Sequence, residues 1–68
     1  MTRGTYRLKV KIAGRKAAEA TIPVDPDDPG DLAAAARELL DDRGLRDARQ
    51  VTVEIYRGGC YLREVRIR

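Results

Sequence analysis

The sequence contains no histidine, no tryptophan and no phenylalanine, and its one cysteine is Cys60. Histidine is the side chain best suited to proton transfer near neutral pH, and Cys60 has no histidine with which to form a thiolate–imidazolium pair. The sequence therefore predicts no catalytic residues, and we do not expect an enzyme. A single cysteine also cannot form an internal disulfide, which favours a reducing compartment such as the cytoplasm.

Long apolar runs are missing as well. No stretch approaches the roughly 18 residues that a transmembrane helix needs, and no signal-peptide pattern opens the chain. The composition, 43% hydrophobic and 37% charged, is typical of a folded globular protein. A chain of 68 residues has room for one core. We therefore expect one cytoplasmic domain over residues 1–68, with no membrane contact and no site for a small-molecule substrate.

The net charge of +3 is the remainder of three segments of alternating sign. Residues 1–24 carry six basic side chains and one acidic one, residues 25–45 carry seven acidic and two basic ones, and residues 46–68 carry six basic and three acidic ones. Basic segments therefore enclose an acidic one, a pattern that suits steered association with another protein.

Residues 5–12 alternate between apolar and basic side chains, as a half-buried strand does. The apolar positions are Tyr6, Leu8, Val10 and Ile12, and the basic ones are Arg7, Lys9 and Lys11. A second alternating stretch follows over residues 18–24, after a predicted three-residue loop at Gly14-Arg15-Lys16. Such a loop would place Val10 opposite Ala20, Leu8 opposite Ile22 and Lys11 opposite Glu19. Pro23 has no N–H to donate, which predicts an edge position for this strand.

The next segment has the signals of a helix over residues 29–43. Asp28 is a good N-cap, Pro29 suits the first helical position, and Asp31 lies three residues after the cap, as in a capping box. An apolar stripe is formed by Leu32, Ala36, Leu39 and Leu40. Gly44 suits the end of the helix, with Leu45 closing back onto Leu40.

A second hairpin is predicted from a strand over residues 51–56, a turn at Gly58-Gly59 and a strand over residues 60–68. A two-residue loop would set Ile55 opposite Leu62, but it would point Glu64 and Arg66 inward. A three-residue loop would set Ile55 opposite Tyr61 and bury Val65 and Ile67, but it would direct Arg63 inward. Either a bulge near Arg63-Glu64 resets the face, or Arg63 lies near an edge and extends outward.

This order of elements predicts an α+β domain of the type ββαββ. A right-handed connection through the helix favours parallel first and last strands at the centre of a mixed four-stranded sheet, in the order 2-1-4-3. The third strand would then be an edge.

The strand Thr5-Tyr6-Arg7-Leu8-Lys9-Val10 leading to Gly14, the alternating stretch 18–24 and the helix closing at Gly44-Leu45 resemble the β-grasp group. This group contains the ubiquitin-like folds and the small immunoglobulin-binding domains of the protein G type. The resemblance implies a fold and no function. The pair Gly58-Gly59 is interior and followed by a strand, so the chemistry of a C-terminal diglycine is not expected.

The acidic run from Asp25 to Asp31 does not match a calcium loop, because the position of the bidentate glutamate is held by Ala36. We therefore expect these acids to cap the helix and to keep the protein soluble. No metal and no cofactor is expected.

The remaining candidate site is the solvent face of the sheet. Its predicted partner-binding residues are Arg7, Lys9, Lys11, Tyr56 and Arg66. The first hypothesis is a small non-catalytic module, such as a regulator, an adaptor or an accessory domain, that binds another protein. It would bind through this face or through an edge formed by the second or third strand, and edge pairing would also permit a homodimer. The alternative hypothesis is a small nucleic-acid-binding regulator that uses the same basic face.

Overall fold

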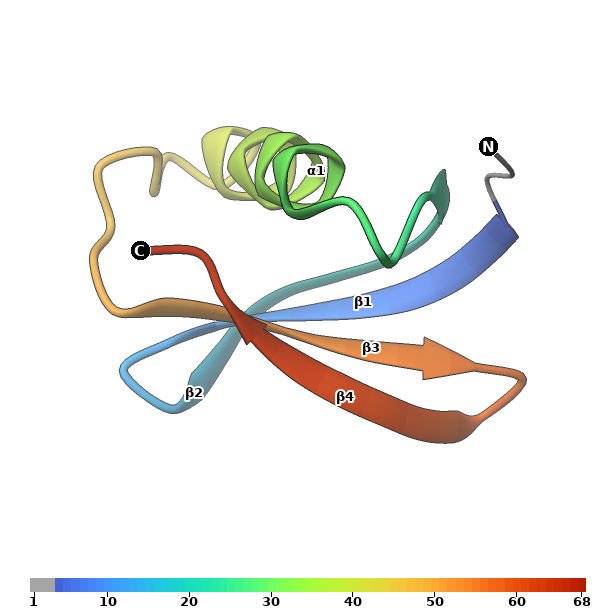
Figure 1. The fold of residues 1–68 in the computed structure, drawn as a ribbon. Coiled ribbons are helices and arrows are strands. Elements are labelled where there is room, and N and C mark those ends of the chain that lie inside the picture. Colours follow the sequence, from blue (N-terminus) through green and yellow to red (C-terminus); the bar gives the residue numbers. More distant parts are fainter. Residues whose placement is uncertain (1–3) are drawn as a thin grey trace.

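The computed structural model describes residues 4–68, which form one four-stranded sheet with a helix on one face (Figure 1). In chain order the elements are β1 (Gly4–Ile12), β2 (Arg15–Val24), α1 (Pro29–Asp41), β3 (Val51–Arg57) and β4 (Cys60–Arg66). The predicted α+β class is confirmed. Among the described residues, α1 is too short and too polar to cross a membrane.

The first hairpin has a shorter loop than the sequence predicted. The chain turns at Ala13 and Gly14, whose φ angles are 50° and 83°, and these left-handed angles are those of a tight two-residue turn. Leu8 consequently faces Ala20, and the predicted pairings of Val10 with Ala20, Leu8 with Ile22 and Lys11 with Glu19 are wrong. The correct partners of Leu8 and Val10 differ from the predicted ones by two residues, so these side chains keep their predicted face, whereas Lys11 faces Lys16, three residues from Glu19.

β2 lies at an edge of the sheet, as Pro23 predicted. Pro23 faces Thr5 near the end of the strand. The register between β1 and β2 shifts by one residue after Val10, because Ala17 is the extra residue of a bulge in β2 and has no partner on β1.

The helix begins where its capping residue predicted. The Asp28 side chain accepts hydrogen bonds from the backbone N–H groups of Gly30 and Asp31, at 2.9 and 3.4 Å. The predicted capping box is wrong, because the carboxylate of Asp31 accepts from the N–H of Asp25 instead, at 2.8 Å. Asp31 therefore fastens the end of β2 to the first turn of α1.

The helix ends at Asp41, two residues before the predicted end. The Leu45 N–H donates to the Leu40 carbonyl at 2.8 Å, and the Gly44 N–H donates to the Asp41 carbonyl at 3.0 Å. These are the two hydrogen bonds of a Schellman motif, and Gly44 takes the left-handed φ of 71° that the motif needs. The predicted closure of Leu45 onto Leu40 is confirmed.

The second hairpin has the two-residue loop together with a bulge, and the three-residue loop that the sequence left open is not found in residues 4–68. Gly58 and Gly59 form a two-residue loop, Tyr56 faces Tyr61, and Ile55 then faces Arg63. Leu62 is thus the extra residue of a bulge, one position before the expected site. After the bulge, Val65 faces Val53 on the helix side of the sheet, and Arg63 also points to that side.

The predicted sheet order and the mixed sheet are wrong. The order is β2-β1-β3-β4, and every neighbouring pair is antiparallel. After α1 the chain returns to the turn between β1 and β2, where the Ala13 N–H donates to the Gln50 carbonyl at 3.0 Å. β3 therefore begins beside β1. β3 is therefore a central strand and β4 an edge. The parallel central pair that the β-grasp resemblance implies is not found in residues 4–68.

The difference in burial between the two last strands explains this order. β3 alternates cleanly and buries Val51, Val53 and Ile55, whereas most side chains of β4 are exposed. A central strand is covered on one face by the helix and on both edges by strands, so the more apolar strand is more stable there.

One side of the sheet carries the core and the other is open. The buried side chains are Leu8, Val10, Ala18, Val24, Leu32, Ala36, Leu40, Val51, Val53 and Ile55. They lie between the sheet and α1, which packs mainly over β1 and β2. Figure 1 shows the helix above the sheet and no element below it. We call the uncovered side the outer face.

A candidate protein-binding face

The outer face collects all the partner-binding residues that the sequence predicted. Its side chains come from alternate positions of four strands, and they include Arg7, Lys9, Lys11, Glu19, Glu54, Tyr56, Tyr61, Glu64 and Arg66. Arg7, Lys9 and Lys11 lie along β1. Tyr56 lies beside them on β3, and Arg66 lies at the end of β4. Alternation places the residues of β1 and β3 together, and the bulge at Leu62 brings Glu64 and Arg66 of β4 to the same face.

Tyr56 is the centre of a cluster of cations and rings. Arg7 faces it across the β1–β3 pair. The Arg7 guanidinium lies 5.1 Å and the Lys9 ammonium 4.8 Å from the centroid of the Tyr56 ring, distances typical of cation–π contacts. The ring of Tyr61 meets Tyr56 edge-on, with the centroids 5.6 Å apart. Aromatic and cationic groups are therefore packed into one patch.

A hydrogen-bonded group adjoins this cluster. Glu54 accepts from the Lys11 ammonium at 2.9 Å and from the Tyr56 hydroxyl at 3.0 Å. These two hydrogen bonds lower the pKa of Glu54, the one from Lys11 having the larger effect. In return, the hydrogen bond to Glu54 raises the pKa of Lys11 and that of Tyr56. Tyr56 is thereby held in a fixed orientation and in its neutral form.

We expect this group to make the stability of the fold depend on pH at the acidic end. The pKa of Glu54 is lower in the folded protein than its ordinary value of 4.5, so its contribution is present above pH 4.5 and is lost as the pH falls through the folded pKa. In an NMR titration of the Glu54 carboxyl carbon, the midpoint should lie below 4.5 in the wild type and move towards 4.5 in Lys11→Met. Equal midpoints in the two proteins would show that Lys11 does not hold the carboxylate.

The outer face is only slightly basic. The carboxylates of Glu19, Glu54 and Glu64 alternate with its basic groups, and Glu19 pairs with Arg7 at 3.4 Å. Lys9 and Arg66, in contrast, form no ion pair with any residue in 4–68. Arg3 belongs to the same basic segment but lies outside the described residues. Lys9 faces Glu19 on β2 and Glu54 on β3, and its charge helps to lower the pKa of Glu54. Arg66 faces Thr52, so it is the predicted basic residue with no carboxylate directly opposite it.

The sequence interpretation did not include two exposed apolar residues of β4 among its site residues. Tyr61 is 54% exposed and Leu62 is 48% exposed, and they lie next to each other on an open edge strand. Tyr61 contacts Tyr56, whereas Leu62 occupies the bulge. The sequence signal that could have identified them is the Gly58-Gly59 turn, because a two-residue turn at this place sets Tyr61 opposite Tyr56.

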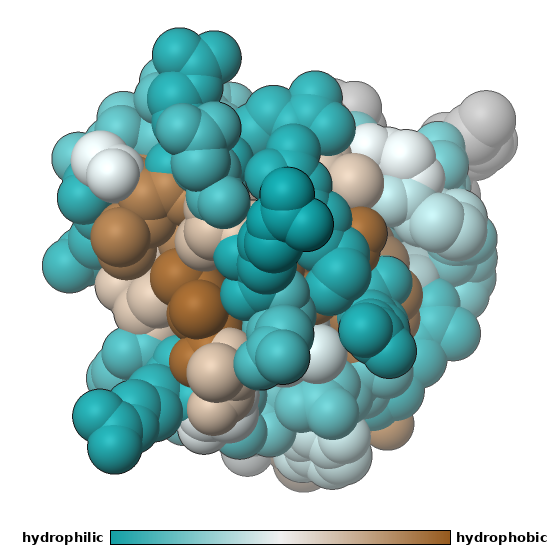
Figure 2. Space-filling model, turned by 90° about the vertical axis from the view of Figure 1, so that its left-hand side faces the viewer, coloured by the Kyte–Doolittle hydropathy of each residue, from teal (hydrophilic) through white to brown (hydrophobic). Residues whose placement is uncertain are grey.

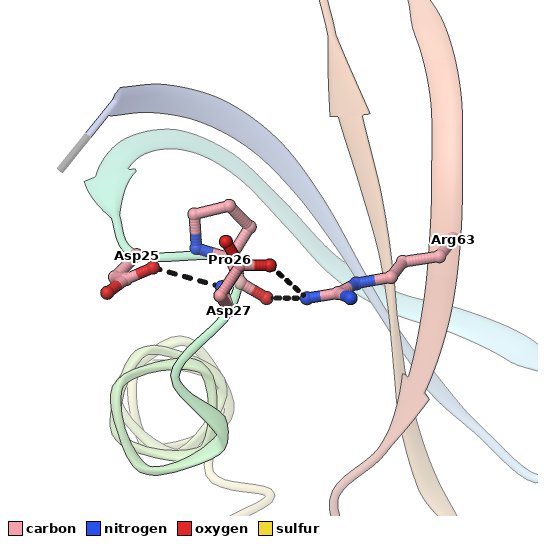
Figure 3. A network of polar contacts seen from close by, with 4 residues as sticks. All are labelled: Asp25, Pro26, Asp27 and Arg63. Atoms are coloured by element: carbon pink, nitrogen blue, oxygen red, sulfur yellow. Dashed lines mark hydrogen bonds and ion pairs between the residues drawn. The ribbon is translucent and has the colours of Figure 1, made fainter. Parts of the chain in front are cut away.

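Arg63 shows why the acidic run before the helix is structural. Figure 3 shows its side chain reaching from β4 to the loop between β2 and α1, where it donates to the Pro26 carbonyl and to the Asp27 carboxylate, the latter at 3.2 Å. Asp25 accepts from the N–H of Asp27 at 3.0 Å. The run thus caps the helix, shapes the loop and ties it to the edge strand. Residues 4–68 contain no group of three metal-ligating side chains.

Apolar surface also gathers at the end of the molecule that carries the first turn and the loop after α1 (Figure 2). An open groove there is lined by the apolar Ala17, Ala18, Leu39 and Leu45 and by the charged Glu19, Asp42 and Arg43. A small hollow lies on the other side of α1, between Leu40 and Ile67, and measures about 60 Å³. That is room for about two water molecules, far below the roughly 300 Å³ of a small ligand pocket.

No family model, no curated protein and no solved structure matches this chain. The arguments for its function therefore come from the outer face and the sheet edges alone.

Proposed function

We propose that the protein is a small non-catalytic module that binds another protein through its outer face. It would act as a regulator, an adaptor or an accessory domain. The observation that carries this proposal is the Tyr56 cluster, a ring held between Arg7 and Lys9 on a face that no other element covers.

The composition of this patch is that of an interface centre. Tyrosine and arginine are enriched among the residues that carry most of the binding energy in protein complexes. Tyr56 is also orientated in advance, because its hydroxyl donates to Glu54 at 3.0 Å. A side chain that is already fixed loses little conformational entropy on binding.

The charges indicate the kind of partner. Lys9 and Arg66 form no ion pair within residues 4–68, so a carboxylate brought by another protein could pair with them without breaking an existing ion pair. Exposed charges of this kind mainly raise the association rate and fix the orientation of the partner. We therefore propose an acidic protein surface as the binding partner.

One observation favours nucleic acid as the alternative. Proteins that bind single strands stack bases on exposed aromatic rings, and Tyr56 and Tyr61 lie side by side on the outer face. However, the Tyr56 ring is already in contact with Arg7 and Lys9. Three carboxylates on the same face would also repel phosphates. A protein partner accounts for both features without moving any side chain.

The test compares two double variants with the same loss of charge. Arg7→Ser/Lys9→Ser removes the cations beside Tyr56, and Arg37→Ser/Arg43→Ser removes two exposed arginines on the helix side. Proteins captured from the native cytoplasm by the wild type should be lost with the first variant and kept with the second. Binding to labelled oligo-dT, followed by anisotropy at several salt concentrations, should be weak in all three proteins.

Two results would overturn the proposal. Equal capture by both variants would show that the outer face is not the binding surface. Tight oligo-dT binding that falls steeply with salt and disappears in Arg7→Ser/Lys9→Ser would instead establish the nucleic-acid alternative.

A further inference from the structure

We propose that two copies of this chain associate through β4, in an antiparallel pairing centred on Val65. This inference concerns an edge of the sheet and goes beyond the proposed function, which concerns its outer face. It follows from the backbone pattern of β4, from the charges on the strand and from its exposed apolar residues.

The backbone of β4 has free hydrogen-bonding groups at known positions. The Ile67 N–H donates to the Val51 carbonyl at 2.8 Å and so points towards β3, while the Val51 N–H donates to the Arg68 carbonyl at 3.2 Å. Hydrogen-bonded and non-hydrogen-bonded pairs alternate along an antiparallel ladder. The pairs of Arg66 with Thr52 and of Glu64 with Glu54 are therefore non-hydrogen-bonded. The N–H and C=O groups of Glu64 and Arg66 consequently point away from β3, towards the open edge.

Only a few registers join two such edges. The β4 strand of the second copy must place its own outward-pointing N–H and C=O groups opposite those of Glu64 and Arg66. Each side chain must also stay on the face of the sheet, inner or outer, that it occupies in one copy. A pairing centred on Glu64 would set two glutamates opposite each other, and one centred on Arg66 would set two arginines opposite each other. Like charges directly opposite are destabilising.

The pairing centred on Val65 sets opposite charges or two valines against each other at its three central positions, Glu64, Val65 and Arg66. Glu64 faces Arg66 of the second copy on the outer face, and the two-fold axis repeats this contact. Each of these pairs exchanges two backbone hydrogen bonds. Val65 faces Val65 of the second copy on the inner face, in a non-hydrogen-bonded position where side chains approach closely.

The exposed residues of the two edges also favour β4 over β2. Leu62, 48% exposed, lies on β4 and would lie at the new interface. An open edge strand with exposed apolar side chains otherwise invites uncontrolled aggregation. β2 in contrast carries Pro23, which has no N–H for a ladder.

Such a dimer would have a continuous eight-stranded sheet. The two outer faces would lie side by side on it, each with its own Tyr56 cluster. Because Arg66 is paired with Glu64 in the dimer, a partner with two acidic sites would then contact the cations beside Tyr56 in both copies, with a gain in overall affinity from the second contact.

The experiment uses charge exchange. Glu64→Arg and Arg66→Glu each place like charges opposite each other in a homodimer, so each variant should be monomeric at 7.6 kDa in analytical ultracentrifugation. Mixed one to one, they should form a dimer, because a Glu64→Arg copy and an Arg66→Glu copy bring opposite charges together at both contacts. Glu38→Arg and Arg37→Glu, on the exposed side of α1, serve as controls and should leave the wild-type dimer intact.

Four results would overturn this inference, of which three concern the dimer itself. These three are a wild type that is monomeric, a dimer that both single variants leave unchanged, and two monomeric variants that stay monomeric on mixing. Open-ended polymers would indicate head-to-tail pairing of β4 with β2 and would also overturn it. A monomeric wild type that still captures its partner through Arg7 and Lys9 would leave the proposed function intact.

Discussion

Replacing Val53 by alanine is expected to lower the free energy of unfolding by about 2–3 kcal/mol, whereas Val65→Ala should lower it by about 1 kcal/mol or less. The two valines face each other on neighbouring strands, and both point to the helix side. Val53 is fully buried, whereas Val65 is only partly buried at the edge of the sheet. The first change leaves a cavity in the core, and the second leaves a gap that water and neighbouring side chains can fill.

This pair of variants tests the sheet order directly. If β4 were central and β3 an edge, the larger loss would fall on Val65→Ala. Urea unfolding of both variants should be measured in a Glu64→Arg background, so that any association through β4 does not contribute to the result. Equal losses, or a larger loss at Val65, would contradict the order β2-β1-β3-β4. A small domain has only about 5 kcal/mol of stability, so the difference is easily measured.

The elements that the sequence predicted well are those fixed by neighbouring residues. Asp28 caps the helix, and the chain closes around Gly44 after it, because both features need only a few consecutive residues. The same holds for the faces of β1 and β3, since alternation depends on the backbone of one strand. These local rules were sufficient to place the Tyr56 cluster on one side of the sheet.

The elements that the sequence did not predict depend on contacts between distant segments. The register of the first hairpin depends on whether Ala13 accepts a left-handed conformation, which alternation does not reveal. The sheet order depends on whether β3 or β4 is stabilised more by burial in the centre of the sheet. The sequence contained a signal for this, because Arg63-Glu64 interrupts the alternation of the last strand while Val51, Val53 and Ile55 leave the third strand uninterrupted.

The candidate site was predictable in composition and not in its contacts. Arg7 and Lys9 were expected on the same face as Tyr56, but only the antiparallel pairing of β1 with β3 brings them over the ring. In the order 2-1-4-3, β4 would separate β1 from β3. The cation–π cluster is thus a consequence of the same topology that Val53→Ala and Val65→Ala test.

Replacing Tyr56 by alanine is expected to weaken the binding of the captured protein partner by about thirtyfold, which corresponds to about 2 kcal/mol for a central aromatic residue of an interface. Tyr56→Phe should keep most of the affinity, because it retains the ring between Arg7 and Lys9 and loses only the hydroxyl that donates to Glu54. Affinities would be measured by isothermal titration with the purified partner.

The comparison of the two variants separates binding from folding. The Tyr56 side chain lies on the outer face and not in the buried core, so both variants should remain folded in thermal unfolding experiments. Unchanged affinity in Tyr56→Ala would show that the ring lies outside the interface. Equal losses in Tyr56→Ala and Tyr56→Phe would assign the effect to the hydroxyl and to Glu54. A large loss in Tyr56→Ala alone would assign the effect to the aromatic ring, which contacts the partner or holds Arg7 and Lys9 in place for it.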